Sequence, residues 1–317
     1  MNTLVSVIMS VYNEKKEWLE DSLDSILKQS LTNLEFIIIV DNPNNKQLIE
    51  VVQNYSKKDS RIQYYINDKN YGLVYSLNKA LGFARGEYVA RMDADDISYP
   101  QRLEKQLEFL KTNKLDLVGA NVELFNDEQG VFYTTKKLTT CKYITKLLKA
   151  GTIGVVHPTF FLRKEVYDLL GGYNNALHVE DKDFLARVLC EGFCAGNTTE
   201  VLLKYRYSNQ SITKSNAVFV EYMGKYITKL FKDCSQHGSY NFDVNYQKQL
   251  KVTKKQRESH NLKQQLMGKA REELGNKKFF SFFATLLKAL LHSRSTLGGI
   301  RINLVLLYYR FLEKVGM

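Results

Sequence analysis

Four short apolar runs, each followed by a segment of helical pattern, are the feature that most constrains the fold of this 317-residue chain. The runs cover residues 4–11, 34–40, 61–66 and 87–92, and the segments after them carry apolar residues at helical spacing. Apolar runs without polar alternation are typical of strands buried on both faces of a parallel sheet. We therefore expect an α/β fold in which helices flank a mostly parallel sheet and ligands bind at the carboxyl ends of the strands.

The pattern loosens after residue 114, where we expect a mixed-sheet half that completes the same domain. Residues 115–125, 155–162 and 201–207 predict strands, and residues 181–190 predict a helix. Beyond residue 215 the sequence changes to helical patterns rich in Lys, Gln and aromatic residues. The expected organisation is one domain over residues 1–215 and a C-terminal helical extension over residues 216–317.

The net charge of +11 lies entirely in the extension. Residues 216–317 contain 18 Lys and Arg against 7 Asp and Glu, whereas residues 1–215 contain 27 of each kind. This asymmetry indicates a polyanionic partner, either an anionic membrane surface or nucleic acid, although a solvated helical face would also account for it. No recognised nucleic-acid-binding motif accompanies the charge, so we expect no nucleic-acid partner.

Two apolar stretches in the extension, residues 279–287 and 302–309, are too short to span a bilayer, which takes about 20 apolar residues. Lys and Arg interleaved with Phe, Leu and Tyr suit a helix that lies in the membrane interface. The alternative is an ordinary amphipathic helix that packs on its own domain. The sequence thus predicts a basic, amphipathic helical region that associates with membranes.

The four cysteines, Cys141, Cys190, Cys194 and Cys234, form no CxxC pair and no zinc-ligand spacing. We expect reduced thiols in a cytoplasmic protein. The N-terminus runs directly into the first apolar run without a basic region before it, so we expect no signal peptide.

The acidic cluster Asp93-Ala94-Asp95-Asp96 follows the fourth apolar run, and Pro100 precedes the next helical pattern. Carboxylates this close repel one another, which raises at least one pKa unless a cation is present. Mn²⁺ or Mg²⁺ takes hard oxygen ligands and would neutralise them while binding a nucleotide diphosphate. The alternative for an isolated Asp-x-Asp is a solvated acidic turn.

Seven motifs in a fixed order resemble the family 2 glycosyltransferases, which have the Rossmann-like GT-A fold. They span about residues 4–213 and comprise residues 7–14, 35–41, 70–72, 84–88, 93–96, 157–159 and 171–173 followed by Glu180-Asp181. The resemblance implies a catalytic domain with a nucleotide-sugar half at residues 1–100 and an acceptor half at residues 101–215. Among relatives, the chain looks most like small bacterial enzymes that extend lipid-linked O-antigen or capsule repeat units.

In the nucleotide half, the resemblance implies that residues after the first two strands hold the base. These residues are Val11, Tyr12, Asn13, Glu14 and Asp41, and Asp41 would accept a hydrogen bond from uracil N3–H. Turn formation or helix capping is the alternative role of Asp41. Arg85 would hold the base or the pyrophosphate, with surface ion pairing as its alternative.

For the metal, the resemblance implies Asp95 as the chief ligand and Asp93 beside both ribose and metal. Asp96 would bind the metal through a water molecule or contact the acceptor or a phosphate. The bound Mn²⁺ or Mg²⁺ would stabilise the departing nucleoside diphosphate as a Lewis acid.

For the reaction, the resemblance implies that Asp181 deprotonates the acceptor hydroxyl and Glu180 orients the acceptor, with Asp183 as the nearest rival base. A carboxylate at a helix N-terminus tends to stay ionised, as a base must. His157 and Arg206 are candidates for acceptor or phosphate contact. Ser208 stands where relatives often have a histidine, which weakens the expectation that the loop after Arg206 contacts the metal or the phosphates.

The predicted protein is an inverting, metal-dependent transferase that moves sugar from a UDP-sugar to a polyprenyl-diphosphate-linked glycan. It would work in the cytoplasm, peripherally on the inner face of the cell membrane. The alternative is an inactive nucleotide- or glycan-binding protein of the same fold. The transferred sugar, the linkage and the oligomeric state stay open.

Overall fold

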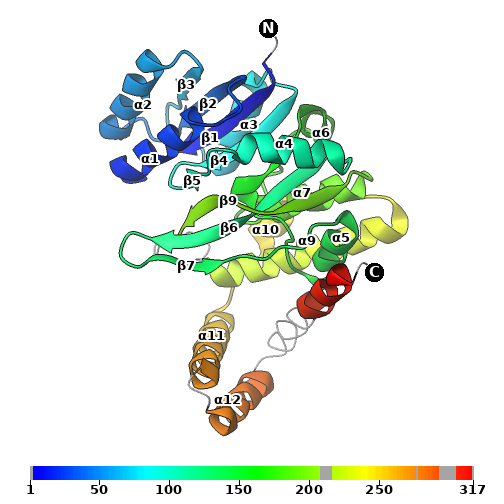
Figure 1. Ribbon diagram of the computed structural model, residues 1–317. Coiled ribbons are helices and arrows are strands. Elements are labelled where there is room, and N and C mark those ends of the chain that lie inside the picture. Colours follow the sequence, from blue (N-terminus) through cyan, green and yellow to red (C-terminus); the bar gives the residue numbers. More distant parts are fainter. Residues whose placement is uncertain (1–2, 208–215, 276–277, 293–304, 316–317) are drawn as a thin grey trace.

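The computed structural model describes residues 3–207, 216–275, 278–292 and 305–315. Their strands form one mixed sheet in the order β3-β2-β1-β4-β8-β6-β9-β5, with β7 paired to β6 (Figure 1). Helices cover both faces of this sheet, so the expected α/β class is confirmed.

The first half has the predicted alternation of strand and helix. Four parallel strands lie side by side, β1 (Val5–Val11), β2 (Leu34–Val40), β3 (Ile62–Ile66) and β4 (Tyr88–Asp93). The helices are α1 (Lys16–Leu27), α2 (Lys46–Lys58), α3 (Leu73–Phe83) and α4 (Arg102–Thr112).

Strand β2 shows why the strands of the first half are continuous apolar runs in the sequence. All of its residues are buried, because its side chains enter two different cores. Phe36 and Ile38 join the core that α1 and α2 cover, whereas Ile37 and Ile39 join the core beneath α3. A strand buried on both faces has no solvent side on which polar residues would alternate.

The second half is mixed, as expected. It contains β5 (Ile97–Ser98), β6 (Leu117–Asn126), β7 (Gly130–Thr134), β8 (Phe161–Arg163) and β9 (Ala195–Arg206). Its helices are α5 (Cys141–Ala150), α6 (Lys164–Leu170) and α7 (Glu180–Cys190). Strand β8 runs antiparallel to β4 and β6, whereas β6 and β9 are parallel.

The prediction of a strand over residues 155–162 is wrong for most of its length. A 3-10 turn, η1 (His157–Thr159), occupies its centre, and only β8 at its end is strand. Pro158 lacks the N–H that a sheet ladder requires. The Thr159 hydroxyl bonds back to the Val156 carbonyl at 2.6 Å, which stabilises the turn.

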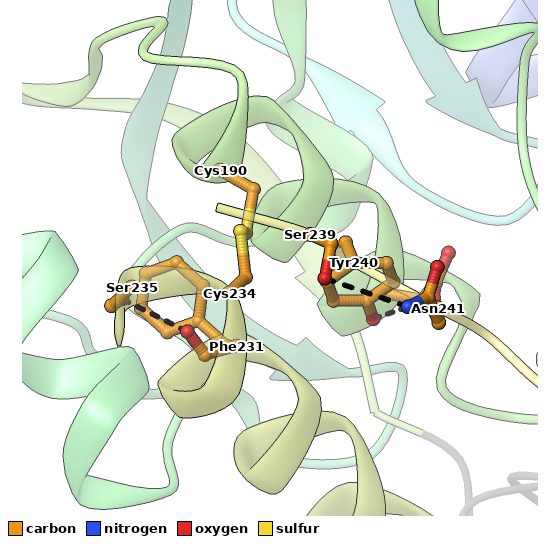
Figure 2. The surroundings of a disulfide bond; sticks show 8 residues. Cys190, Phe231, Cys234, Ser235, Ser239, Tyr240 and Asn241 are labelled. Carbon is orange, nitrogen blue, oxygen red and sulfur yellow. Dashed lines mark hydrogen bonds between the residues drawn. A yellow bond between two sulfur atoms is a disulfide. The ribbon is translucent and has the colours of Figure 1, made fainter. Parts of the chain in front are cut away.

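A disulfide joins Cys190 at the end of α7 to Cys234 of α9 (Ala217–His237), as Figure 2 shows. The expectation that all four cysteines are reduced is therefore wrong for this pair. Helix α9 packs on α7 and brings the two Cα atoms to 6.3 Å, although 44 residues separate them in sequence. Cys141 and Cys194 are not in disulfides.

Helix α9 belongs to the main body of the protein, because Met223, Ile227 and Phe231 are buried in the same core as α7. The chain continues through α10 (Val244–Gln249), α11 (Lys254–Gly275) and α12 (Phe279–His292). Figure 1 shows α11 and α12 apart from the sheet, while the C-terminal helical segment at residues 305–314 returns beside α5. The boundary expected at residue 215 stays a prediction.

The apolar stretches of the extension fall on α12 and on residues 305–314, and part of the second lies outside the described residues. Within the described part of the chain, no helix is both long and apolar enough to cross a membrane.

Candidate active site

The carboxyl ends of β2, β1 and β4 bring three predicted site segments to one edge of the sheet. Strand β1 lies between the other two, with Val11 opposite Val40 and Ser10 opposite Asp93. The Asp41 N–H also donates to the Val11 carbonyl at 2.7 Å. Residues that leave these strands therefore emerge side by side, although about 80 residues of chain separate them.

The acidic turn after β4 gathers its three carboxylates. One oxygen of each of Asp93, Asp95 and Asp96 lies within 4.8 Å of the others. Asp96 is buried, and Asp93 and Asp95 are half-buried. Burial, and then the neighbouring carboxylates, raise the pKa of both Asp95 and Asp96. The protein alone therefore disfavours full ionisation of this cluster.

These residues fit a divalent cation. The Oδ2 atom of Asp96 is buried and has no hydrogen-bond partner among the described residues. A buried carboxylate oxygen without a donor is costly, and a cation would satisfy it and lower the raised pKa values. Hard carboxylate oxygens this close are the donor set that Mn²⁺ or Mg²⁺ takes, with substrate oxygens and water completing the shell.

Arg206 holds the acidic turn in place. Its side chain is 3% exposed, and its Nε donates to the Asp95 carbonyl at 2.8 Å. The guanidinium also pairs with Asp127 and lies between the rings of Trp18 and Phe125. The predicted contact of Arg206 with acceptor or phosphate is therefore not supported, because its donors are used inside the protein.

The second acidic pair opens α7. Burial raises the pKa values of Glu180 and Asp181, while the Lys182 N–H, bonded to Asp181 Oδ1 at 2.6 Å, favours the ionised form of Asp181. The rival base Asp183 is fully buried and is bound by Arg187 at 2.9 Å and by the Tyr240 hydroxyl at 2.8 Å. Asp183 is thus a structural residue, and the role of Asp181 as the base stays a prediction.

One cavity of about 660 Å³ joins the two groups of acids. Asp93 from β4 and Glu180 and Asp181 from α7 all line it. Its volume lies in the range of small-molecule sites, about 300–1,000 Å³. The cavity can therefore hold a ligand that reaches both the acids suited to a metal ion and the carboxylates at the start of α7.

Comparisons with known proteins agree with this geometry. Residues 6–171, more than half of the chain, match the profile described as "Glycosyl transferase family 2". The chain belongs to this family. This glycosyltransferase is 37% identical over 211 residues to an uncharacterized glycosyltransferase of Methanocaldococcus jannaschii, covering 65% of the present chain and 72% of the relative. It is 34% identical over 220 residues to the O-antigen biosynthesis glycosyltransferase WbnJ of Escherichia coli, covering 69% and 85% respectively.

The glycosyltransferase also resembles a solved structure, S. aureus TarS 1-349 in complex with UDP-GlcNAc. The TM-score is 0.59 at 17% sequence identity, and the match covers 78% of this chain and 70% of TarS 1-349. At this identity the likeness concerns the fold. It confirms the predicted GT-A architecture of the glycosyltransferase.

The residues predicted for the base lie beyond the end of β1. Val11 is buried in the strand, whereas Tyr12 is 41% exposed. Glu14 accepts the Tyr12 N–H at 2.8 Å, and Asn13 Oδ1 accepts the side-chain amide of Asn42 at 2.6 Å. Burial raises the pKa of Glu14. Their contact with a nucleotide stays a prediction.

Asp41 organises the loop before α3. Its carboxylate is 2% exposed and accepts the amide of Asn67 at 2.7 Å, the Tyr71 N–H at 3.0 Å and the Gly72 N–H at 2.7 Å. Gly72 has a φ of 87°, which residues with a side chain rarely adopt. The geometry therefore favours a loop-holding role for Asp41, and uracil recognition stays a prediction.

Arg85 lies at the opposite edge of the sheet, so its predicted contact with the base or pyrophosphate is wrong. It precedes β4, at the amino end of the strand, whereas Asp93 ends it. Its guanidinium donates to Glu35 at 2.7 and 3.0 Å. Its position before a strand, rather than after one, is the sequence signal that places it away from the site.

His157 lines the cavity as a buried, neutral side chain. Its Nε2 lies 3.0 Å from the Tyr173 hydroxyl, and its Nδ1 lies 3.9 Å from Glu180. Burial and the nearby Arg91 lower the pKa of His157 well below its usual value. The imidazole thus bonds to Tyr173 and lies near Glu180, while the predicted contact with acceptor or phosphate stays a prediction.

Arg91 and Tyr173 are site residues that the sequence analysis does not identify. Arg91 is 3% exposed and binds both oxygens of Asp93, at 2.5 and 2.9 Å. Tyr173 bonds to Tyr167 at 2.8 Å in addition to His157, and both Arg91 and Tyr173 line the cavity. The signal for Arg91 is a charged residue inside an apolar strand, two positions before the acidic turn.

Proposed function

We propose that this glycosyltransferase moves a sugar from a UDP-sugar to a hydroxyl of a lipid-linked oligosaccharide, with inversion and with a divalent metal ion. The observation that carries the proposal is that Asp93 and Asp181 line the same cavity. An in-line displacement at the anomeric carbon requires an acid that holds the metal ion and a base in reach of the same ligand, and one shared cavity allows both.

On the donor side, residues 11–14 and the acidic turn would bind the UDP-sugar, with the nucleotide half at residues 1–100 and the acceptor half at residues 101–215. Asp95 and Asp93 would hold Mn²⁺ or Mg²⁺, and Asp96 would support them. When bound, the metal ion would stabilise the negative charge of the departing diphosphate. Arg206 keeps the Asp95 backbone in place for this role.

On the acceptor side, Asp181 would take the proton of the acceptor hydroxyl. The hydroxyl oxygen then forms a bond to the anomeric carbon from the face opposite UDP, the bond from that carbon to the diphosphate breaks, and UDP leaves. An α-linked donor thus gives a β-glycoside. A positioned general base contributes about 10²–10⁴ in rate.

The acceptor class rests on a relative and on the extension of this chain. WbnJ is by name an O-antigen biosynthesis glycosyltransferase, which supports a role in surface polysaccharide synthesis for the present chain. A polyprenyl-diphosphate-linked acceptor would reside in the membrane, and the basic extension would attach the enzyme peripherally to the cytoplasmic face. The alternative is a nucleotide- or glycan-binding protein without turnover.

The test compares the same substitution at two acids. A panel of UDP-sugars with Mn²⁺ is assayed for UDP release to water and to octyl glycosides, and the anomeric configuration of any product is read by NMR. Asp181→Asn should lower turnover about 10²–10⁴-fold and leave Mn²⁺-dependent UDP binding, measured by calorimetry, unchanged. Asp95→Asn should instead remove the Mn²⁺-dependent part of UDP binding.

Asp168→Asn is the matched control, since that carboxylate is 61% exposed and pairs only with Lys164 among the described side chains. It should behave as wild type. Turnover of half the wild-type rate in Asp181→Asn would contradict the role of Asp181. A wild-type protein that binds UDP but turns over no donor would favour the binding protein.

A further inference from the structure

Two exposed tyrosines stack on each other in the lining of the cavity that holds Asp181. Tyr71 and Tyr75, at the start of α3, stack with ring centroids 4.3 Å apart and planes inclined by 21°. Both line the cavity, and Tyr75 is 45% exposed. The ammonium group of Lys69 lies 4.9 Å from the centroid of Tyr71. Tyr71 is thus held by two neighbours and supports Tyr75, which presents the more open ring.

The loop between Tyr173 and α7 also lines the cavity. Leu177 of this loop is 45% exposed and lies in the lining beside His178. The Leu177 N–H donates to Gln247 of α10 at 3.1 Å, and the His178 ring packs edge-on against Phe219 of α9. These contacts hold the loop in place in the cavity lining.

His178 has a backbone conformation that is uncommon for its residue type. Its φ is 62°, in the left-handed region. Such residues persist where the surrounding structure holds them, and they gather at ligand sites. Burial lowers the pKa of His178, so the ring is a neutral imidazole with one donor and one acceptor. This is a suitable group for a hydroxyl of a ligand.

The cavity belongs to the acceptor side of the site. Glu180 and Asp181, the proposed acceptor residues, line it, and Asp93 lies at its boundary with the donor acids. Residues 11–14 and Asp41, which are predicted to hold the nucleotide base, are not part of its lining. A ligand on Tyr75 would therefore share the cavity with the proposed base, and Asp41 adjoins the cavity only through its bonds to the Tyr71 and Gly72 N–H groups.

The side chains that line the cavity fit a pyranose ring. One face of a pyranose carries C–H bonds, which are slightly positive, and the face of an aromatic ring is negative. Hydroxyl groups at the ring edge need donors and acceptors, which His178 and the carboxylates at the base of the cavity supply. A cavity lined by an aromatic ring, an aliphatic side chain and polar groups therefore suits a sugar.

We propose that the cavity lined by Tyr75, Leu177 and His178 is the acceptor subsite and that it binds a pyranose whose apolar face stacks on Tyr75. The inference rests on the proposed function and names the chemistry of its acceptor. The accepting sugar therefore has C–H bonds along one ring face next to the hydroxyl that Asp181 deprotonates.

The test measures binding of a panel of octyl glycopyranosides by saturation-transfer NMR, with UDP and the diamagnetic Mg²⁺ present. In the wild type, saturation should build up fastest on C–H protons of one ring face. Tyr75→Ala should weaken this binding at least tenfold, whereas Tyr75→Phe, which keeps the ring, should stay within twofold of wild type. Tyr133→Ala on β7 is the control, since Tyr133 is 54% exposed and lies outside the cavity lining.

The UDP signal in the same samples separates this proposal from the proposed function. Equal loss of UDP and glycoside binding in Tyr75→Ala would place the ring in the nucleotide site and overturn the subsite. Unchanged glycoside binding in Tyr75→Ala, or no binding of any panel member to wild type, would also overturn it. Failure of the proposed function would appear elsewhere, as wild-type protein without donor turnover, because the binding measurement requires no reaction.

Discussion

At the scale of single residues, Arg91 decides how the two groups of acids share one cavity. It is the buried cation beside Asp93, and its charge also favours the ionised forms of Glu180 and Asp181. Its Nε is buried and has no hydrogen-bond partner among the described residues. Bidentate binding by arginine fixes the orientation of a carboxylate as well as its charge.

Replacing Arg91 should therefore affect catalysis through position. We expect Arg91→Met to lower kcat/KM about 10²-fold, since small misplacements of reacting groups cost about that much. Arg91→Lys should keep the charge but lose the two-point grip on Asp93, and should fall between Arg91→Met and wild type. Steady-state kinetics with the best donor of the panel would measure both, with Arg163→Met, whose side chain is 41% exposed, as the control.

The effects on stability and on activity can be separated for the pair of Arg91 and Asp93. Removal of one partner of a buried pair costs about 3–5 kcal/mol, less here because the Asp93 side chain is 29% exposed. The double variant Arg91→Met with Asp93→Asn removes both charges and should regain stability but not activity. Recovery of activity in the double variant would contradict the positioning role.

At the scale of elements, Glu221 joins α9 to α11. It accepts hydrogen bonds from Lys225 of its own helix at 2.7 Å, and from Lys263 at 2.9 Å and His260 at 3.0 Å on α11. Burial alone would raise its pKa, but the lysines lower the pKa of Glu221 to about 2. Gln256 of α11 also donates to the Tyr222 hydroxyl of α9 at 3.0 Å, so Glu221 is the charged part of this contact between the two helices.

Glu221→Gln should destabilise the protein by about 1–2 kcal/mol at neutral pH, because hydrogen bonds from charged groups are lost. The folded pKa of about 2 lies below the ordinary value of 4.5, so the contribution is complete above about pH 4.5 and is lost as the pH falls toward 2. Urea unfolding of wild type and variant between pH 7 and pH 3 would measure the difference. A constant difference over that range would contradict it, and Glu258→Gln, at a side chain 66% exposed, is the control.

At the scale of the whole molecule, exposed apolar side chains gather on the extension that carries the net charge. On α12, Phe280 is 95% exposed, Phe283 64% and Leu287 56%. On the C-terminal segment, Leu307 is 61% and Phe311 60% exposed, while the opposite face packs on α5 through Tyr309 and Leu312. Apolar groups beside basic residues are typical of helices that bind an anionic membrane interface.

We expect the double variant Phe280→Ser with Phe283→Ser to reduce co-sedimentation with phosphatidylglycerol vesicles at least tenfold. The charge is unchanged, so a weak, salt-sensitive binding should remain. The control replaces two exposed residues of β7, Val131→Ser with Tyr133→Ser, and should bind as wild type. Equal vesicle binding by the α12 variant and wild type would refute membrane association through α12.

The limits of sequence interpretation are clear at particular residues. The acidic turn and the pair at the start of α7 are predictable, because each follows a strand or a glycine turn and shows its chemistry locally. Arg85 precedes β4, which already indicates a position away from the site, whereas Arg206 ends β9. The burial of Arg206 beneath the acidic turn depends on neighbours from distant segments, which no local pattern shows.

By itself the sequence determined the parallel half of the sheet, the family and the acids that line the cavity. Buried strands and helices have periodic apolar patterns, and the acids lie in short local motifs. The tertiary structure alone decided that Arg91, Tyr75 and Leu177 line one cavity, and that Cys190 meets Cys234. Each of these depends on how helices pack across the sheet. That packing is a property of the whole chain, so no local pattern records it.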